Sequence, residues 1–250
     1  MKLKLLFNLL NLVTGGLFNF KTFEIRSMRF ISFIFLISIS TGQWTSFELD
    51  DLSDYSKDFE SLYRTAGLSA THNFNIPING DNRITYGGSL LKGISTNGIL
   101  PILHSQIKVS WNMTLRGRMA EYSAKEGAIQ MFGWGASLRL GKENEPSKWI
   151  INFDSGYLNS HDVVKVSSLQ AMAVREIVLN NFPIYFGLGF NILKAVPYES
   201  EEIRYQGNKE IQTNLILIGT VISVLEFKVI PQIWFGPEFS MILLNLAGTF

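Results

Sequence analysis

The sequence contains no cysteine, three histidines and no excess of charge of either sign. Without cysteine the chain has no disulfide, no thiolate metal ligand and no thiol nucleophile. Because His72, His104 and His161 lie far apart in the sequence, we expect no metal site. The 22 Lys+Arg residues balance 21 Asp+Glu residues, so the chain lacks the basic surface that nucleic-acid binding requires.

Cofactor motifs are also missing. The sequence has no phosphate-binding loop, paired metal motif or nucleotide fingerprint, so no cofactor is expected. It does contain 46% hydrophobic residues, too many for a disordered chain, with 13% aromatic residues and 21 glycines. Aromatic side chains fit the pleated surface of a sheet, and 250 residues suit one all-β domain. This composition predicts a β protein but names no substrate.

Residues 28–42 have the order of a secretory signal peptide. A short positive start precedes the uncharged run Phe30–Ile39, which is too short to anchor the chain in a bilayer. The small residues Ser40 and Gly42 follow at the −3 and −1 spacing of a cleavage site. We therefore expect export of the chain, with cleavage near Gly42.

Two further segments flank this signal. We interpret Met28 as the true initiator and residues 1–27 as an upstream extension of the reading frame; the alternative is an amino-terminal membrane helix. Residues 43–66 are polar and acidic and show no strand pattern, which predicts a periplasmic lead-in or a partial plug. Within them, Phe47–Arg64 is a candidate docking segment for an envelope complex.

The rest of the chain shows strand-like alternation. Apolar and polar residues alternate along Gln106–Met119, which predicts one long strand with an apolar and a polar face. Similar patterns recur, and with a final strand ending at Phe250 they predict about ten strands between Gly67 and the carboxyl terminus. The other predicted strands are Leu68–Ile78, Arg83–Ser95, Phe132–Leu140, Trp149–Asp154, Val163–Ile177, Ile184–Ile192, Ile211–Ile222 and Phe227–Phe235.

The last strand carries a family resemblance. It alternates through Ile242, Leu244 and Leu246 to a terminal Phe250, which resembles the assembly signal of Gram-negative outer-membrane β-barrel proteins. The resemblance covers residues 67–250. It implies insertion by the barrel-assembly machinery, an outer-membrane location and outer-membrane lipid as the surroundings of the barrel.

The predicted fold is an all-β, antiparallel, transmembrane up-and-down β-barrel of about ten strands, within a range of about 8–12. The alternative is a soluble exported barrel that binds a hydrophobic ligand. Long strands, a charged content of 17% and large aromatic residues favour the membrane barrel. The candidate interfacial aromatics are Trp111, Trp134, Trp149, Tyr157, Tyr185 and Trp234.

In a membrane barrel the polar face of each strand lines the lumen. We interpret the lumen charges as cross-barrel ion pairs that fill a narrow interior without an open pore, with a weakly anion-preferring channel as the alternative. The predicted lumen-lining residues are Arg83, Lys108, Arg116, Arg118, Arg139 and Lys228, with the acidic Asp154, Glu210 and Glu226.

The sequence favours a structural role or passive transport of small solutes rather than catalysis. Ser160, His161 and Asp162 have the residue types of a lipid hydrolase, but neighbouring positions rarely form a catalytic triad. A lipid acyl hydrolase, and a barrel subunit of a secretion or adhesion complex, remain the alternative functions.

Amino-terminal sequencing of the native protein tests the segment assignments. We expect the mature chain to begin at Gln43 or Trp44, because the signal segment is removed after export. A peptide that contains Phe18–Lys21 would contradict both the initiator at Met28 and the cleavage near Gly42.

Overall fold

The computed structural model describes residues 55–74, 83–93, 98–124, 127–160, 164–179, 182–198, 208–224, 227–237 and 239–249. Within these ranges no helix is both long and apolar enough to span a membrane. The elements are α3 (Tyr55–Thr71), β1 (Ile84–Gly93), β2 (Leu100–Lys108), β3 (Met113–Ala124), β4 (Gly127–Lys142), β5 (Glu145–Ser160), β6 (Val164–Leu179), β7 (Phe182–Pro197), β8 (Lys209–Thr220), β9 (Ile222–Val224), β10 (Phe227–Gly236) and β11 (Phe239–Thr249).

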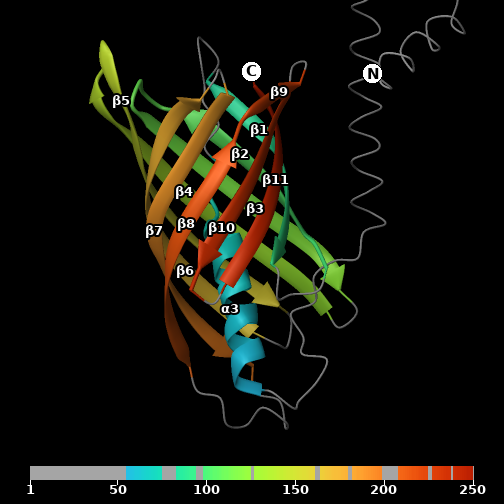
Figure 1. Ribbon diagram of the computed structural model, residues 1–250. Coiled ribbons are helices and arrows are strands. Elements are labelled where there is room, and N and C mark those ends of the chain that lie inside the picture. The colour runs from blue at the N-terminus through green and yellow to red at the C-terminus, as the bar shows by residue number, and fades with distance from the viewer. Residues whose placement is uncertain are drawn as a thin grey trace, which may run out of the picture. The chain divides into compact units, whose positions relative to one another are not determined.

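The strands form one closed antiparallel barrel (Figure 1). Each strand pairs with its neighbour in the chain, and β11 pairs with both β10 and β1, which closes the ring. The short β9 continues β8 along β10, with a break at Val221, so the two act as one barrel strand. The barrel therefore has ten strand positions, and the prediction of an up-and-down barrel of about ten strands is confirmed.

Two of the predicted strands are wrong, and their errors cancel in the count. Leu68–Ile78 is not the first strand: its described start belongs to α3, residues 75–82 lie outside the described ranges, and the barrel begins at Ile84. Gln106–Met119 is not one strand but the hairpin of β2 and β3, in which the amide of Val109 donates to the Met113 carbonyl over 2.9 Å.

The register explains why the hairpin reads as one strand. Ile107 pairs with Leu115, and Lys108 pairs with Thr114. Paired residues in an antiparallel ladder share a face, and both members of each pair have the same parity in the sequence. The alternation of the sequence therefore continues through the turn without interruption.

The two faces of the barrel wall are those that the alternation predicted. On β4 the outward Phe132 and Trp134 are 41% and 65% exposed, whereas the inward Ile129 and Met131 are buried. On the long strands, the apolar side chains of the alternating pattern thus point away from the barrel axis. A soluble barrel would place these large side chains inside.

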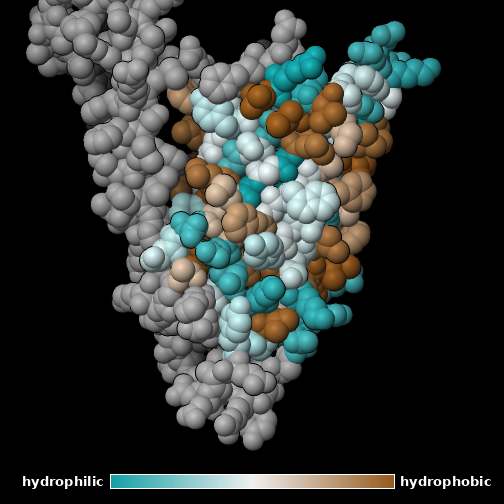
Figure 2. Space-filling view, turned by 180° about the vertical axis from the view of Figure 1, so that it is seen from behind, coloured by the Kyte–Doolittle hydropathy of each residue, from teal (hydrophilic) through white to brown (hydrophobic). Residues whose placement is uncertain are grey.

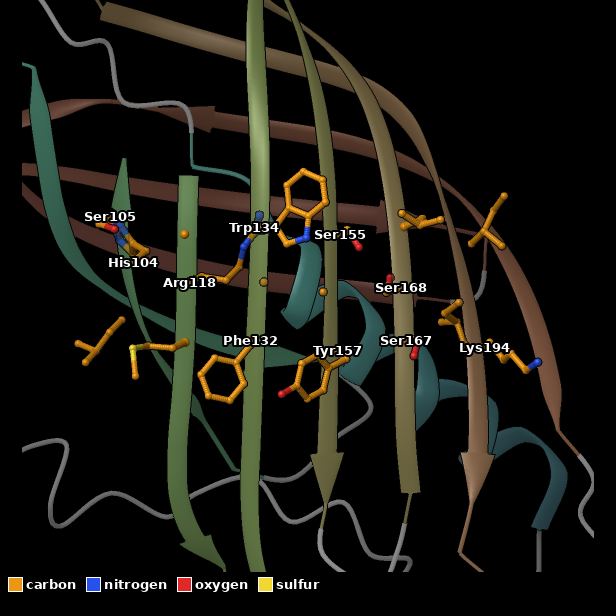
Figure 3. A pocket seen from close by; sticks show the side chains of 18 of the residues that line it. His104, Ser105, Arg118, Phe132, Trp134, Ser155, Tyr157, Ser167, Ser168 and Lys194 are labelled. Carbon is orange, nitrogen blue, oxygen red and sulfur yellow. The ribbon is translucent and has the colours of Figure 1, made fainter. Parts of the chain in front are cut away.

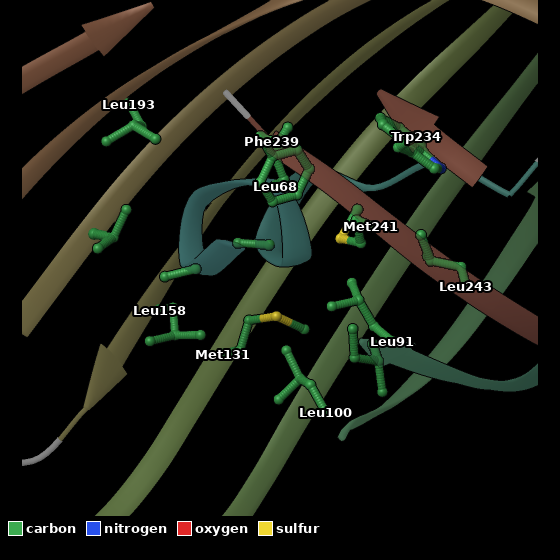
Figure 4. Close-up of a cluster of buried hydrophobic side chains, with 14 of the residues drawn as sticks. Leu68, Leu91, Leu100, Met131, Leu158, Leu193, Trp234, Phe239, Met241 and Leu243 are labelled. Carbon is green, nitrogen blue, oxygen red and sulfur yellow. The ribbon is translucent and has the colours of Figure 1, made fainter. Parts of the chain in front are cut away.

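The lumen holds α3, which Figure 1 shows inside the ring of strands. Leu68 of this helix lies among inward side chains from strands around the barrel (Figure 4). The helix is surrounded by wall on several sides, so it buries polar as well as apolar residues and has no single apolar face. The strand residues of this cluster that Figure 4 labels are Leu91, Leu100, Met131, Leu158, Leu193, Trp234, Phe239, Met241 and Leu243.

Candidate functional site

The first part of α3 is fixed to the start of β8. Glu60 accepts hydrogen bonds from Lys209 Nζ over 3.1 Å and from Arg64 over 2.5 Å, and Arg64 also donates to Thr213. Burial raises the pKa of Glu60, but the hydrogen bonds and positive charges of Lys209 and Arg64 outweigh it and lower this pKa. The first half of α3 therefore lies at the barrel end where β7 and β8 connect, which we call the helix end of the barrel.

The last turn of α3 rests on two glycines of the wall. Gly133 of β4 and Gly156 of β5 are cross-strand partners on the inner face. A Cβ atom at either position would overlap the carbonyl oxygen of Ala70. Only the missing side chains let the helix backbone approach the wall here. We call Gly133 and Gly156 the glycine seat.

An arginine caps the carboxyl-terminal end of the helix. Arg118 of β3 donates to the carbonyl oxygen of His72, one residue beyond α3, and forms an ion pair with Asp154 of β5. A cation at this end also interacts favourably with the helix dipole. Thr71 adds a polar contact, because its hydroxyl accepts a hydrogen bond from Asn191 Nδ2 over 2.9 Å.

Asp154 holds a second arginine on the same side of the lumen. Arg116 Nη2 donates to both of its carboxylate oxygens, over 3.0 and 2.9 Å, and Nη1 donates to Asn152 Oδ1 over 3.0 Å. The side chains of Arg116, Arg118 and Asp154 are at most 1% exposed. Buried charges need partners at close range, and here one carboxylate serves two guanidinium groups. This cluster, the arginine pair with Asp154, carries one surplus positive charge.

The structure thus brings together three of the predicted lumen residues, Arg116, Arg118 and Asp154. Their ion pairs reach from β3 over one strand to β5 rather than across the lumen. Arg139 forms a separate, partly exposed ion pair with Glu176 of β6 over 3.0 Å.

The remaining predicted charges do not join this cluster. Lys228 is half-buried on β10, Lys108 is the last residue of β2, and Arg83 is exposed just before β1. Glu210 is not a lumen residue: it is exposed on the outward parity of β8 and aligned with Lys194 of β7.

Several predicted residues lie outside the described residues: Glu226, Phe250, His161 and Asp162. In the described ranges no group of three or more His, Asp or Glu residues could hold a metal ion.

The sequence analysis gave a partial plug over residues 43–66 as one alternative, but it did not predict that a helix continues to Thr71 inside the lumen. His72 lies within the predicted strand Leu68–Ile78, yet it is fully buried just beyond the helix, where its Nδ1 lies 2.7 Å from the Ser69 carbonyl oxygen. Trp234 and Tyr185 are not interfacial, because both are buried on the inner face. The signal that could have revealed a filled lumen is the glycines on the polar parity of β4 and β5.

Comparisons with known proteins gave structural similarity alone. No family model and no curated protein matches the chain. The translocator domain of autotransporter NalP from Neisseria meningitidis is similar at 9% identity and a TM-score of 0.42, over 69% of this chain and 89% of that chain. Acinetobacter baumannii outer membrane protein Omp33 is similar at 8% identity and a TM-score of 0.35, over 68% and 98%. The N-terminal β-barrel domain of Pseudomonas aeruginosa OprF is similar at 13% identity and a TM-score of 0.29, over 69% and 100%.

Replacing Gly156 by valine tests the glycine seat. The added side chain meets the carbonyl oxygen of Ala70, and such overpacking costs roughly 1–3 kcal/mol. We expect hydrogen exchange of the α3 amides to accelerate by about five- to a hundredfold.

The matched control is Gly117→Val on the outer face of β3, where a Cβ atom would have only the Ser105 hydroxyl within 4 Å, at 3.7 Å. Equal exchange rates in the wild type, the Gly156 variant and this control would show that α3 does not depend on the seat.

Proposed function

We propose that the chain is an integral outer-membrane β-barrel whose lumen is closed by its own helix α3, with a structural role while the helix is seated. The observation that carries this proposal is the apolar belt on the outer surface, and the filled lumen supports the closed state.

The belt has the height that a bilayer requires. Outward apolar side chains extend over nine residues on β4, from Phe132 to Leu140, and on β7, from Ile184 to Ile192. A strand tilted by about 45° crosses a membrane with roughly 9–11 residues. On the face in Figure 2, near-neutral and hydrophobic residues together cover much of the middle of the barrel, and hydrophilic residues lie mainly toward its two ends.

The outward side chains become polar beyond the belt. Toward the helix end of the barrel these positions hold Gln130, Lys194 and Glu210, and toward the opposite end they hold Lys142 and Glu145. Charged side chains fit the headgroup and aqueous regions but not the hydrocarbon. An apolar band between two polar rims is the pattern of a membrane-spanning barrel.

Aromatic residues lie toward the edges of this belt. Tyr157 is 41% exposed near the helix end and packs against Phe132, with the two rings tilted by 35°. Toward the opposite end, Trp149 packs edge-on against Phe186, with the guanidinium of Arg175 5.5 Å from its ring centroid. Amphipathic aromatic side chains are typical of both membrane interfaces.

A second candidate role is passive transport of small anions after α3 moves. The observation that favours it is the surplus positive charge of the arginine pair with Asp154 in the lumen. Opening would expose two guanidinium groups to passing solutes, and a positively charged lining attracts anions.

Insertion by the barrel-assembly machinery through Phe250 stays a prediction.

Cell fractionation combined with a heat-modifiability gel tests the proposed location. We expect an outer-membrane band whose mobility changes on boiling, because a closed barrel stays folded in detergent until it is heated. A soluble periplasmic band without a mobility shift would contradict the membrane assignment and favour a soluble ligand-binding barrel.

Planar-bilayer conductance tests the closed lumen. We expect no stable conductance steps from the wild type and anion-preferring steps after deletion of Tyr55–Thr71, because the helix occupies the lumen beside Arg116 and Arg118. Arg116→Gln in the deletion variant should reduce the anion preference. Equal conductance with and without the helix would exclude α3 as the closing element.

A further inference from the structure

A groove of about 950 Å³ runs along the surface of the barrel wall from β2 to β8 (Figure 3). It lies on the outer face, because none of its lining residues belongs to α3, although that helix covers the inner side of the same wall at Gly133 and Gly156. Its lining includes exposed side chains such as Leu103 and Trp134. The groove is therefore open to whatever surrounds the barrel.

Strand register explains the shape of the groove. One outward row contains Phe132 paired with Tyr157, and the next contains Trp134 paired with Ser155. Between the rows lie the inward-facing Gly133 and Gly156, whose backbone forms the floor of the groove. Figure 3 shows the rings of Phe132, Tyr157 and Trp134 that border this floor.

Small outward residues extend the groove sideways. Ser105 and Gly117 are cross-strand partners on β2 and β3, and Ser155 lies beyond Trp134 in the same row. The wall itself does not require glycine at position 117, because a Cβ atom there meets only the Ser105 hydroxyl, at 3.7 Å. Gly117 differs in this respect from the glycine seat, where a side chain would overlap the helix backbone.

The groove changes from apolar to charged along its length. On β2 and β3 it is lined by the exposed Leu103 and Met119, which are 58% and 46% exposed. On β7 and β8 it ends at Lys194 and Glu210, which are aligned across the two strands and exposed. An apolar channel with a cation and an anion at one end matches an acyl chain joined to a zwitterionic headgroup.

We propose that this groove binds one phospholipid with a phosphoethanolamine headgroup. The acyl chain lies over Gly117 and the glycine seat, the phosphate accepts hydrogen bonds from Lys194, and the ammonium group donates to the carboxylate of Glu210. This inference rests on the proposed membrane location of the barrel. It assigns one lipid to a defined site, in addition to the membrane lipids that surround the apolar belt as a whole.

Native mass spectrometry of the full-length barrel tests the site. The protein is reconstituted in vesicles of equal parts phosphatidylethanolamine, phosphatidylglycerol and phosphatidylcholine, and then released into the instrument from detergent. We expect one retained phosphatidylethanolamine per chain, at about tenfold excess over the other lipids, because only its headgroup offers both a phosphate and an ammonium N–H donor.

Two groove variants and one control accompany the wild type. Gly117→Leu with Ser155→Leu fills the groove and should abolish retention, and Lys194→Glu should remove the preference for phosphatidylethanolamine. Ser240→Leu, on the outward face of β11 and away from the groove, should retain the lipid as the wild type does.

Equal lipid retention in the wild type and the filled variant would overturn the proposal, and so would retention without a headgroup preference. A mass of two chains without lipid would also overturn it, because that result would identify the groove as a contact between copies of the chain. A heat-modifiability gel of every sample separates these results from failure of the membrane assignment. A barrel that shifts on boiling yet retains no lipid contradicts the lipid site alone.

Discussion

Closure of the sheet between β1 and β11 is the constraint on which the rest of the structure depends. An open strand edge in hydrocarbon has no hydrogen-bond partner, so a sheet that spans a membrane has to close on itself. Side chains reinforce this closure from inside: Ser89 of β1 donates to Asn245 Oδ1 of β11 over 2.5 Å, and Asn245 Nδ2 donates to the Ile230 carbonyl of β10 over 3.0 Å. The first and last strands are thus joined by buried polar contacts as well as by the ladder, and closure creates an inner face that must be filled.

The helix is the consequence of that inner face. A barrel of about eight strands can fill its interior with side chains alone, and ten strands leave additional width. Here α3 occupies this width. Where the helix approaches the wall most closely, the wall has Gly133 and Gly156, which have no side chains. Gly67 of the helix lies so near Leu193 that a Cβ atom at position 67 would come within 2.9 Å of Leu193 Cδ2. Arg118 joins both parts, because it binds Asp154 of the wall and the carbonyl oxygen of His72 at the helix end.

The sequence predicted the class and the faces of the barrel because both follow from a period of two. It could not predict all strand limits. Ile107 and Leu115 face the same side across a turn, so alternation alone does not reveal the turn. Leu68 and Ala70 alternate as they would in a strand, yet they belong to a helix enclosed by wall, where the usual one-sided apolar pattern of a surface helix does not apply. The number of strands was correct because a false strand replaced a missed hairpin.

The same reasoning separates the predictable from the unpredictable parts of the site. Arg116, Arg118 and Asp154 were assigned to the lumen by parity, but parity does not say which charges meet, since that depends on the stagger of neighbouring strands. Glu210 shows the limit more sharply: its parity puts it outside, beside Lys194, and its charge alone had suggested the lumen. A charged residue on the outward parity near a strand end marks where the apolar belt stops. In this barrel that boundary coincides with the charged end of the outer groove, so one pair of residues limits the belt and supplies the polar contacts that we propose for a lipid headgroup.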